Sequence, residues 1–207
     1  PIVVIIDDGS TDGTKDWIEE NYPDIKIIRG NGDLWWSGGI NYGARYAIEE
    51  QNVEFLLLWN NDILANKDYF IKLDELIPNL GNDTILGSKI YYLEPLNKIW
   101  SLGGYFNPQN GKKYMIGYEE LENKTYTSPI EVDWLPGMGT IVPSEIVREI
   151  GYWDDRYFPQ YHGDSDFTYR AKVAGFKIIV NPELIIRNDN TNTGLIHGGS
   201  IKKLLLM

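Results

Sequence analysis

The chain has 207 residues, of which 43% are hydrophobic and 13% aromatic, as is typical of a globular domain with its own core. Lysine and arginine number 19 against 30 acidic residues, so the formal charge is −11 and a nucleic-acid partner is disfavoured. The absence of cysteine excludes disulfides and thiolate metal sites. Because no apolar run reaches the roughly 18 residues of a membrane span and the first residues do not resemble a signal peptide, we expect a cytoplasmic protein.

Strands and helices alternate in the first part of the chain. Residues 2–6 form a continuous apolar, β-branched run, which predicts a parallel strand buried on both faces. The pattern predicts further strands at residues 25–28 and 54–58, with helices at residues 15–22 and 40–50. This alternation indicates right-handed parallel crossovers and a doubly wound sheet, in which ligands lie at the carboxyl ends of the strands.

The second part of the chain has a different pattern. Between about residues 85 and 142, short runs separated by Gly, Asn and Pro predict an antiparallel, partly irregular region. Helices are then predicted at residues 144–150 and 164–174, and a last strand at residues 177–180. The sequence contains no internal repeat, so we expect one domain over residues 1–207.

Two adjacent acids, Asp7 and Asp8, follow the first predicted strand, and a third, Asp12, lies in the turn beyond. A carboxylate at a strand end can accept hydrogen bonds from a nucleobase or from ribose hydroxyls. These acids can instead cap the next helix, where the helix dipole favours negative charge. We favour capping for Asp12 and ligand binding for Asp7.

The third predicted strand ends in Asn60-Asn61-Asp62, which offers oxygen ligands of the kind that Mg²⁺ or Mn²⁺ prefers. One carboxylate is enough if phosphate oxygens and water complete the shell around the metal. The alternative is an Asx turn that ends the strand.

Asp164 lies at the N-terminus of a predicted helix, where the helix dipole favours an ionised carboxylate that can act as a general base. Asp166 is two residues further on and points in another direction, so we expect only one of the two acids in a site. The other would be a cap or a partner of Arg170.

The remaining candidates are aromatic and histidine side chains. Trp35 and Trp36 lie in a glycine-rich segment, residues 30–39, and could stack on a base or a sugar or pack on the next helix. His162 and His197 are isolated, and lone histidines are more often structural than ligands. Residues 201–207 could lie on a membrane surface, although a helix packed on the domain is the simpler interpretation.

Four stretches together resemble the inverting, nucleotide-sugar glycosyltransferases of family 2, which have the GT-A fold. In chain order they are IIDDGSTDGT, GGINYGARYA, LLLWNND and the long segment WLPGMGTIVPSEIVREIGYWDDRYFPQYHGDSDFTYRAKVAGFKI. The resemblance covers about residues 2–186 and is greatest to bacterial enzymes that add rhamnose or related sugars to surface polysaccharides. It implies a mainly parallel, Rossmann-like donor half, about residues 1–92, and a smaller mixed or antiparallel acceptor half, about residues 93–207.

The resemblance also assigns roles. It makes Asp164 the general base for the acceptor hydroxyl, and it places Asp62 with Asn60 at a divalent metal, Mg²⁺ or Mn²⁺, that bridges the diphosphate. The residues that it implies at the donor nucleotide are Asp7, Asp8, Trp36, Gly39 and Asn41. The residues that it implies on the acceptor side are Trp134, Gly137, His162 and Asp166, and His197 would be a displaced ligand of the diphosphate or metal.

The resemblance implies a UDP- or dTDP-linked donor and a glycan or lipid-linked glycan acceptor, with peripheral association at the inner face of the cytoplasmic membrane as a further expectation. The chain departs from the family pattern in several places. Asn60 and Asn61 replace an acid, Gly163 replaces a glutamate and Asn188 replaces a histidine. The sequence starts at what the family pattern makes the second strand, so we expect either a fragment of a longer protein or a numbering that leaves out residues before Pro1. Two alternatives stay open: a nucleotidyltransferase and a non-catalytic glycan- or nucleotide-binding module.

Overall fold

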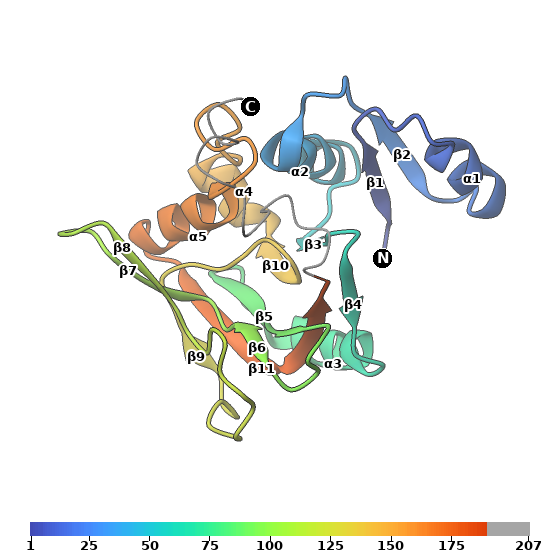
Figure 1. Cartoon of the computed structure of the whole chain (residues 1–207). Coiled ribbons are helices and arrows are strands. Elements are labelled where there is room, and N and C mark those ends of the chain that lie inside the picture. Colours follow the sequence, from blue (N-terminus) through green and yellow to red (C-terminus); the bar gives the residue numbers. More distant parts are fainter. Residues whose placement is uncertain (190–207) are drawn as a thin grey trace, which may run out of the picture.

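The computed structural model describes residues 1–189, which form a mixed α/β fold (Figure 1). The elements in chain order are β1 (Val4–Asp7), α1 (Thr14–Asn21), β2 (Lys26–Arg29), α2 (Trp35–Arg45), the π-helical turn η1 (Tyr46–Glu50), β3 (Phe55–Leu58), β4 (Ile63–Ala65), α3 (Tyr69–Leu76), the 3₁₀ turn η2 (Ile77–Asn79), β5 (Thr84–Tyr92), β6 (Ile99–Ser101), β7 (Gly104–Asn107), β8 (Lys112–Met115), β9 (Ile130–Glu131), β10 (Thr140–Pro143), α4 (Ser144–Ile150), α5 (Gly163–Val173) and β11 (Lys177–Asn188).

Strands β1 and β2 form a separate, parallel two-stranded sheet joined by α1. Helix α2 packs on β1, with Gly39 and Gly43 lying against Ile6. Ile2 and Val3 are each 54% exposed, so the prediction of a strand buried on both faces is wrong. The reason is that β1 is hydrogen-bonded on one side only and, in Figure 1, lies in the part of the molecule that projects from the main sheet.

The main sheet has the strand order β3-β10-β5-β11-β4, with β6 added on β5 and β9 on β11. The long central strands β5 and β11 are parallel, and the other pairs in this sheet are antiparallel. Strand β3 therefore joins β10 instead of extending β1 and β2 into the doubly wound sheet that the alternation predicted. Strands from both sides of residue 92 share this sheet, so the two predicted halves are interleaved.

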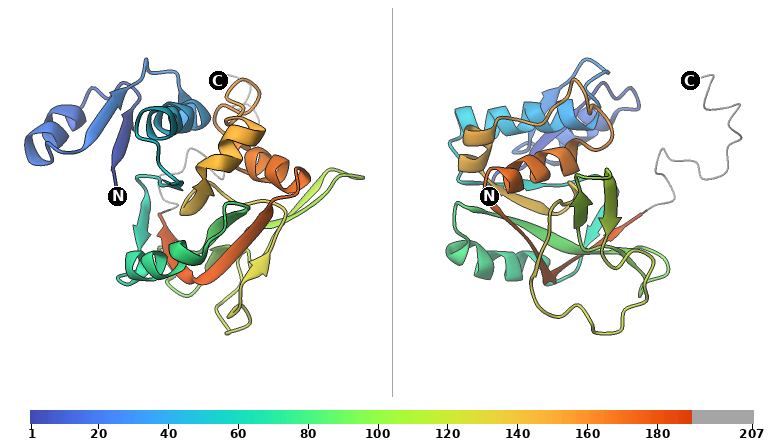
Figure 2. Two further views of the ribbon diagram at one scale, coloured as in Figure 1. Left: turned by 180° about the vertical axis from the view of Figure 1, so that it is seen from behind. Right: turned by 90° about the vertical axis from the view of Figure 1, so that its left-hand side faces the viewer.

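Helices cover both faces of the main sheet (Figure 2). On one face α2, α4 and α5 enclose a core that includes Ile146, Phe167 and Ile178. On the other face α3 buries Tyr69 and Leu73 against the sheet. The sequence analysis assigned no element to α3, although a helix is needed there to cover the second face.

Several predicted elements are confirmed, including α4 at its predicted bounds and α5 within one residue of them. Strand β11 continues well beyond the predicted residues 177–180. Helix α2 begins at Trp35, so the two tryptophans lie in its first turn and not in a loop. Within residues 1–189, no helix is both long and apolar enough to cross a membrane.

Candidate active site

A chain of side-chain contacts joins the parts of the fold that carry the polar motifs. The indole N–H of Trp36, on α2, donates to Oδ1 of Asn60 after β3 at 3.1 Å. The same indole lies against Gly137, where a Cβ atom would come within 2.1 Å of the ring. The backbone N–H of Gly137 donates to Oδ2 of Asp164 at 3.0 Å. The structure therefore brings α2, the end of β3, the loop before β10 and the start of α5 together.

Asp164 lies half-buried in the first turn of α5. Its Oδ1 accepts the backbone N–H of Ser165 at 2.7 Å, and its Oδ2 accepts that of Gly137. A carboxylate has about four acceptor positions, so both oxygens keep capacity for a further hydrogen bond. The carboxylate is thus held in place by backbone groups and can still take a proton from a hydroxyl.

Gly163, where the family pattern has a glutamate, is explained by close packing. A Cβ atom at this position would lie 2.1 Å from Oγ of Ser37 and 3.0 Å from the carbonyl oxygen of Phe158. Ser37 itself donates to that carbonyl at 2.6 Å, and its backbone N–H donates to Pro159. The start of α2 is therefore fastened directly to the loop before α5, which leaves no room for a larger side chain.

Asp166 has a structural partner. It accepts a hydrogen bond from Nε of Arg170 at 2.9 Å, and the Arg170 guanidinium also donates to the carbonyls of Ile150 and Tyr152. This confirms the expectation that one of the two acids pairs with Arg170. Asp166 therefore orients the Arg170 guanidinium, which fastens α5 to the end of α4.

The adjacent acids Asp7 and Asp8 have different surroundings. Asp7 is buried, with Oδ1 accepting the backbone N–H of Ser10 at 2.9 Å and Oδ2 lacking any partner among the described residues. Hydrogen bonds from Ser10 lower the pKa of Asp7, so its carboxylate is charged at neutral pH. An enclosed, charged and unpaired oxygen is suited to a ligand N–H or O–H.

The Asp8 carboxylate accepts three backbone N–H groups, from Gly32 at 2.8 Å, Leu34 at 2.8 Å and Trp35 at 3.3 Å. These groups lie in the loop before α2 and in its first turn, where the backbone donors have no partners within the helix. Asp8 thus caps α2 from a distance. Asp12 accepts the backbone N–H and hydroxyl of Thr14 at the start of α1, in agreement with the predicted capping.

The candidate metal position is formed by the Asp62 carboxylate together with the side-chain amides of Asn60 and Asn188. Oδ1 of Asp62 and Oδ1 of Asn188, at the end of β11, are both buried, and neither has a hydrogen-bond partner within residues 1–189. The backbone N–H of Asp189 donates to the Asp62 carbonyl at 2.9 Å, which places the end of β11 beside Asp62. Residues 1–189 contain no group of three or more His, Cys, Asp or Glu side chains that could hold a metal. Asp62 thus fits a Mg²⁺ or Mn²⁺ ion whose remaining ligands are phosphate oxygens and water.

The other predicted residues are placed as follows. Both ends of the buried Asn41 amide are used, since Nδ2 donates to the carbonyl of Trp153 and to Asp155, and Oδ1 accepts the Trp153 N–H. Trp134 is 3% exposed and its indole N–H donates to the carbonyl of Tyr105. His162 is exposed and precedes α5 in a left-handed conformation. His197 and residues 201–207 lie outside the described part of the chain.

The sequence analysis missed Lys113. It lies on β8, with its ammonium 3.7 Å from the ring centroid of Trp134 and within electrostatic reach of Asp164. Residues 112–115 fall within the antiparallel, partly irregular region predicted between about residues 85 and 142, and no spacing rule connects a lysine there with an acid on a later helix. The one available signal was its charge, next to an aromatic residue in a hairpin.

Comparison with known proteins identifies the family of the chain. A model of glycosyl transferase family 2 matches residues 2–136. The low-salt glycan biosynthesis hexosyltransferase Agl10 of Haloferax volcanii is 28% identical over 177 residues, which are 84% of this chain and 54% of that protein. The chain thus spans about half the length of this curated relative.

Two solved structures have a similar fold. GalNAc-T7, crystallised with UDP, GalNAc and Mn²⁺, superposes with a TM-score of 0.68 at 15% sequence identity. The superposition covers 91% of this chain and 37% of the GalNAc-T7 chain. Residues 1–349 of S. aureus TarS give a TM-score of 0.61 at 17% identity, covering 91% of this chain and 51% of the other. At these identities the likeness establishes the fold alone, and it confirms the GT-A-like fold expected from the sequence.

Proposed function

Since the chain belongs to glycosyl transferase family 2, we propose that it transfers a sugar from a nucleoside diphosphate to a hydroxyl group of a growing glycan. The observation that carries this proposal is the geometry of Asp164. Its carboxylate is fixed by two backbone N–H groups and joined through Gly137 and Trp36 to the strand end that carries Asn60 and Asp62.

In the proposed reaction Asp164 is the general base. The acceptor hydroxyl gives its proton to a carboxylate oxygen while its own oxygen forms a bond to the anomeric carbon. The bond from that carbon to the diphosphate breaks, and the nucleoside diphosphate leaves with the electron pair. Attack from the face opposite the leaving group inverts the configuration, and no covalent intermediate with the protein is required.

Asp7 and Asp62 serve the donor in this proposal. The unpaired oxygen of Asp7 would accept a hydrogen bond from the base or ribose of a UDP- or dTDP-linked donor. Asp62, with Asn60 beside it, would hold a divalent cation at the diphosphate. When bound, Mg²⁺ or Mn²⁺ supplies positive charge that stabilises the leaving group. Rhamnose or a related hexose is the proposed sugar, and a lipid-linked glycan at the inner face of the membrane is the proposed acceptor.

The experiment is to incubate the full-length protein with a panel of nucleotide sugars and to follow the release of nucleoside diphosphate, with NMR assignment of the anomeric configuration of the product. The proposal predicts release from one donor with inversion. Retention of configuration would rule out a direct displacement with Asp164 as the general base. Formation of nucleoside triphosphate from the sugar nucleotide and pyrophosphate would instead support the nucleotidyltransferase alternative.

A further inference from the structure

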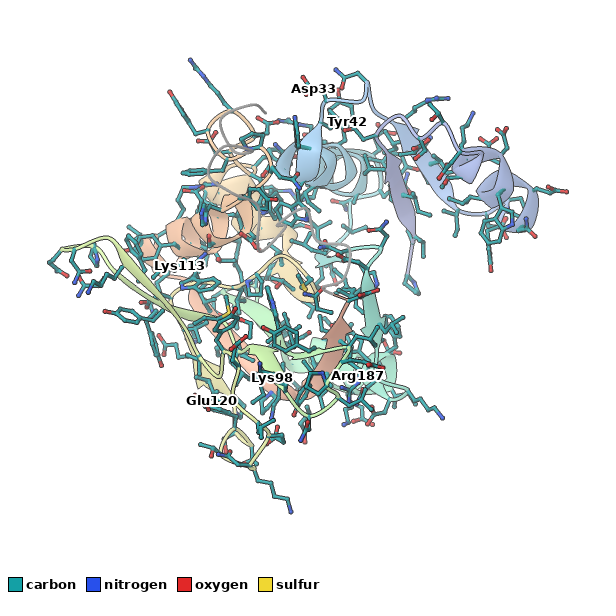
Figure 3. All side chains as sticks on the ribbon, viewed as in Figure 1. Asp33, Tyr42, Lys98, Lys113, Glu120 and Arg187 are labelled. Carbon is teal, nitrogen blue, oxygen red and sulfur yellow. The ribbon has the colours of Figure 1, made fainter. Side chains whose placement is uncertain are left out.

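The β7–β8 hairpin, which carries Lys113, is packed against α5. Its cross-strand partner is Phe106, so both side chains lie on the same face of the hairpin. The Phe106 ring packs edge-on against Tyr169 of α5 at 4.9 Å, and the Phe106 N–H donates to Asp133 at 2.9 Å. This face is therefore fastened to α5, and Figure 3 shows Lys113 on the side of the hairpin next to that helix.

The ammonium of Lys113 is an unpaired cation. It lies over the ring of Trp134, and no carboxylate of residues 1–189 comes within ion-pair distance of it. Desolvation lowers the pKa of Lys113, while the negative charge of Asp164 raises it in part. By contrast Lys172, which also lies near this hairpin, is paired with Glu131 and Asp133. The Lys113 side chain is itself exposed to solvent, so a ligand can reach it, and a cation without an ion-pair partner among the described residues gains from binding an anion.

We propose that Lys113 binds an anionic group of the acceptor, a carboxylate or a phosphate, close to the hydroxyl that faces Asp164. This inference rests on the proposed function, because it takes the space between the hairpin and α5 as the acceptor side. The chain as a whole carries a formal charge of −11 and would repel an anionic glycan. A cation fixed on Trp134 supplies local attraction at the place where the acceptor binds.

The test compares glycosides that differ only in charge. The first pair is methyl β-glucuronide and methyl β-glucoside, which have the same sugar ring and differ in the carboxylate. The second pair is glucose 6-phosphate and glucose, which differ in the phosphate. Saturation-transfer NMR titrations with the full-length protein are expected to give about 5- to 20-fold tighter binding of one of the two anions than of its neutral counterpart, as for a charge-assisted hydrogen bond. The pair that shows the preference identifies the anionic group.

Three variants locate the effect. Lys113→Met keeps the apolar stem and should reduce the preference to less than 2-fold, whereas Lys113→Arg should retain it. Lys112→Met is the matched control, because Lys112 is the adjacent residue on the same strand with its side chain on the opposite face. An unchanged preference in Lys113→Met, or an equal loss in Lys112→Met, would overturn the inference.

Two further outcomes separate this inference from the proposed function. If the wild-type protein releases nucleoside diphosphate but binds charged and neutral glycosides equally or not at all, the inference fails and the proposed function stands. If it prefers anionic glycosides but releases no nucleotide from any donor, the anion site stands and the transferase function fails. Weaker UDP or dTDP binding in Lys113→Met by calorimetry would move Lys113 to the donor diphosphate and overturn the acceptor assignment.

Discussion

Asp7 and Asp8 are neighbours in sequence and differ in what their oxygens contact. Asp8 accepts three N–H groups from the loop before α2 and its first residue, whereas Asp7 keeps a buried oxygen without a partner among residues 1–189. We expect Asp8→Ala to lower the free energy of unfolding by about 1 to 2 kcal/mol, as for loss of a helix cap. Asp7→Asn should leave stability nearly unchanged and weaken nucleotide binding about tenfold or more.

Urea unfolding and calorimetry of UDP and dTDP binding on the two variants measure both effects. The reverse result, with Asp8 controlling nucleotide affinity and Asp7 controlling stability, would contradict these roles. The sequence alone identified the acidic pair but could not separate its members. The role of Asp8 depends on backbone groups more than twenty residues away, and the loop that positions those groups has no periodic pattern.

Asp62, in the turn between β3 and β4, keeps a buried oxygen without a hydrogen-bond partner among residues 1–189. We expect Mn²⁺ to strengthen nucleotide binding in the wild-type protein and to have little effect in Asp62→Asn, because an amide oxygen is a much weaker ligand for a hard cation. Calorimetric titrations with nucleotide, with and without Mn²⁺, measure this coupling. Equal affinities in both conditions for the wild-type protein would remove Asp62 from the metal role.

Among the elements, the segment between β8 and β9 is fastened to the main sheet by a partly buried ion pair. Lys89 and Tyr91 of β5 both donate to Glu122, and Lys89 is 4% exposed. Burial raises the pKa of Glu122, but hydrogen bonds from Lys89, Tyr91 and the Lys124 backbone outweigh it and lower the pKa from 4.5 to about 2. This pair fixes the irregular segment that precedes β9.

We expect Glu122→Gln to lower the free energy of unfolding at pH 7 by about 2 to 3 kcal/mol, because it leaves the Lys89 charge buried and unpaired. The cost is below that of a fully enclosed pair because the Glu122 side chain is 25% exposed. A carboxylate whose pKa is lowered by folding adds stability above its unfolded pKa. The difference between the wild-type protein and the variant should therefore be complete above pH 4.5 and decline as the pH falls toward 2. Urea unfolding at pH 7, 4 and 3 tests this, and a difference independent of pH would contradict the ionic origin.

Local pattern predicted elements well where one helix or strand sets its own period, as for α4 and α5. It did not predict that β3 would pair with β10, because that pairing joins residues more than eighty positions apart and depends on the shape of the whole sheet. Helix α3 was missed although it buries Tyr69 and Leu73. Its start is marked by Asp68, whose side chain makes no capping hydrogen bond, and its end runs directly into η2.

In the whole molecule, the two-stranded β1–β2 sheet connects with the main body largely through α2. Asn41 forms three hydrogen bonds to the segment after α4. We expect Asn41→Leu to lower the free energy of unfolding by about 2 to 3 kcal/mol, because it leaves buried backbone groups of Trp153 unpaired. In the Asn41→Leu variant, hydrogen exchange followed by mass spectrometry should show a larger acceleration, relative to the wild-type protein, in β1 and β2 than in β5 and β11. Uniform acceleration across both sheets would show instead that the two parts unfold as one unit.

The central claim is that Asp164 is the general base of a sugar transfer. The most direct measurement is the rate of nucleoside-diphosphate release at saturating donor by Asp164→Asn relative to the wild-type protein, with donor affinity measured on the same samples. The asparagine is nearly isosteric and can still accept the Gly137 N–H, so we predict unchanged donor binding and a rate at least about 100-fold lower. A rate within about twofold of the wild type would contradict the assignment.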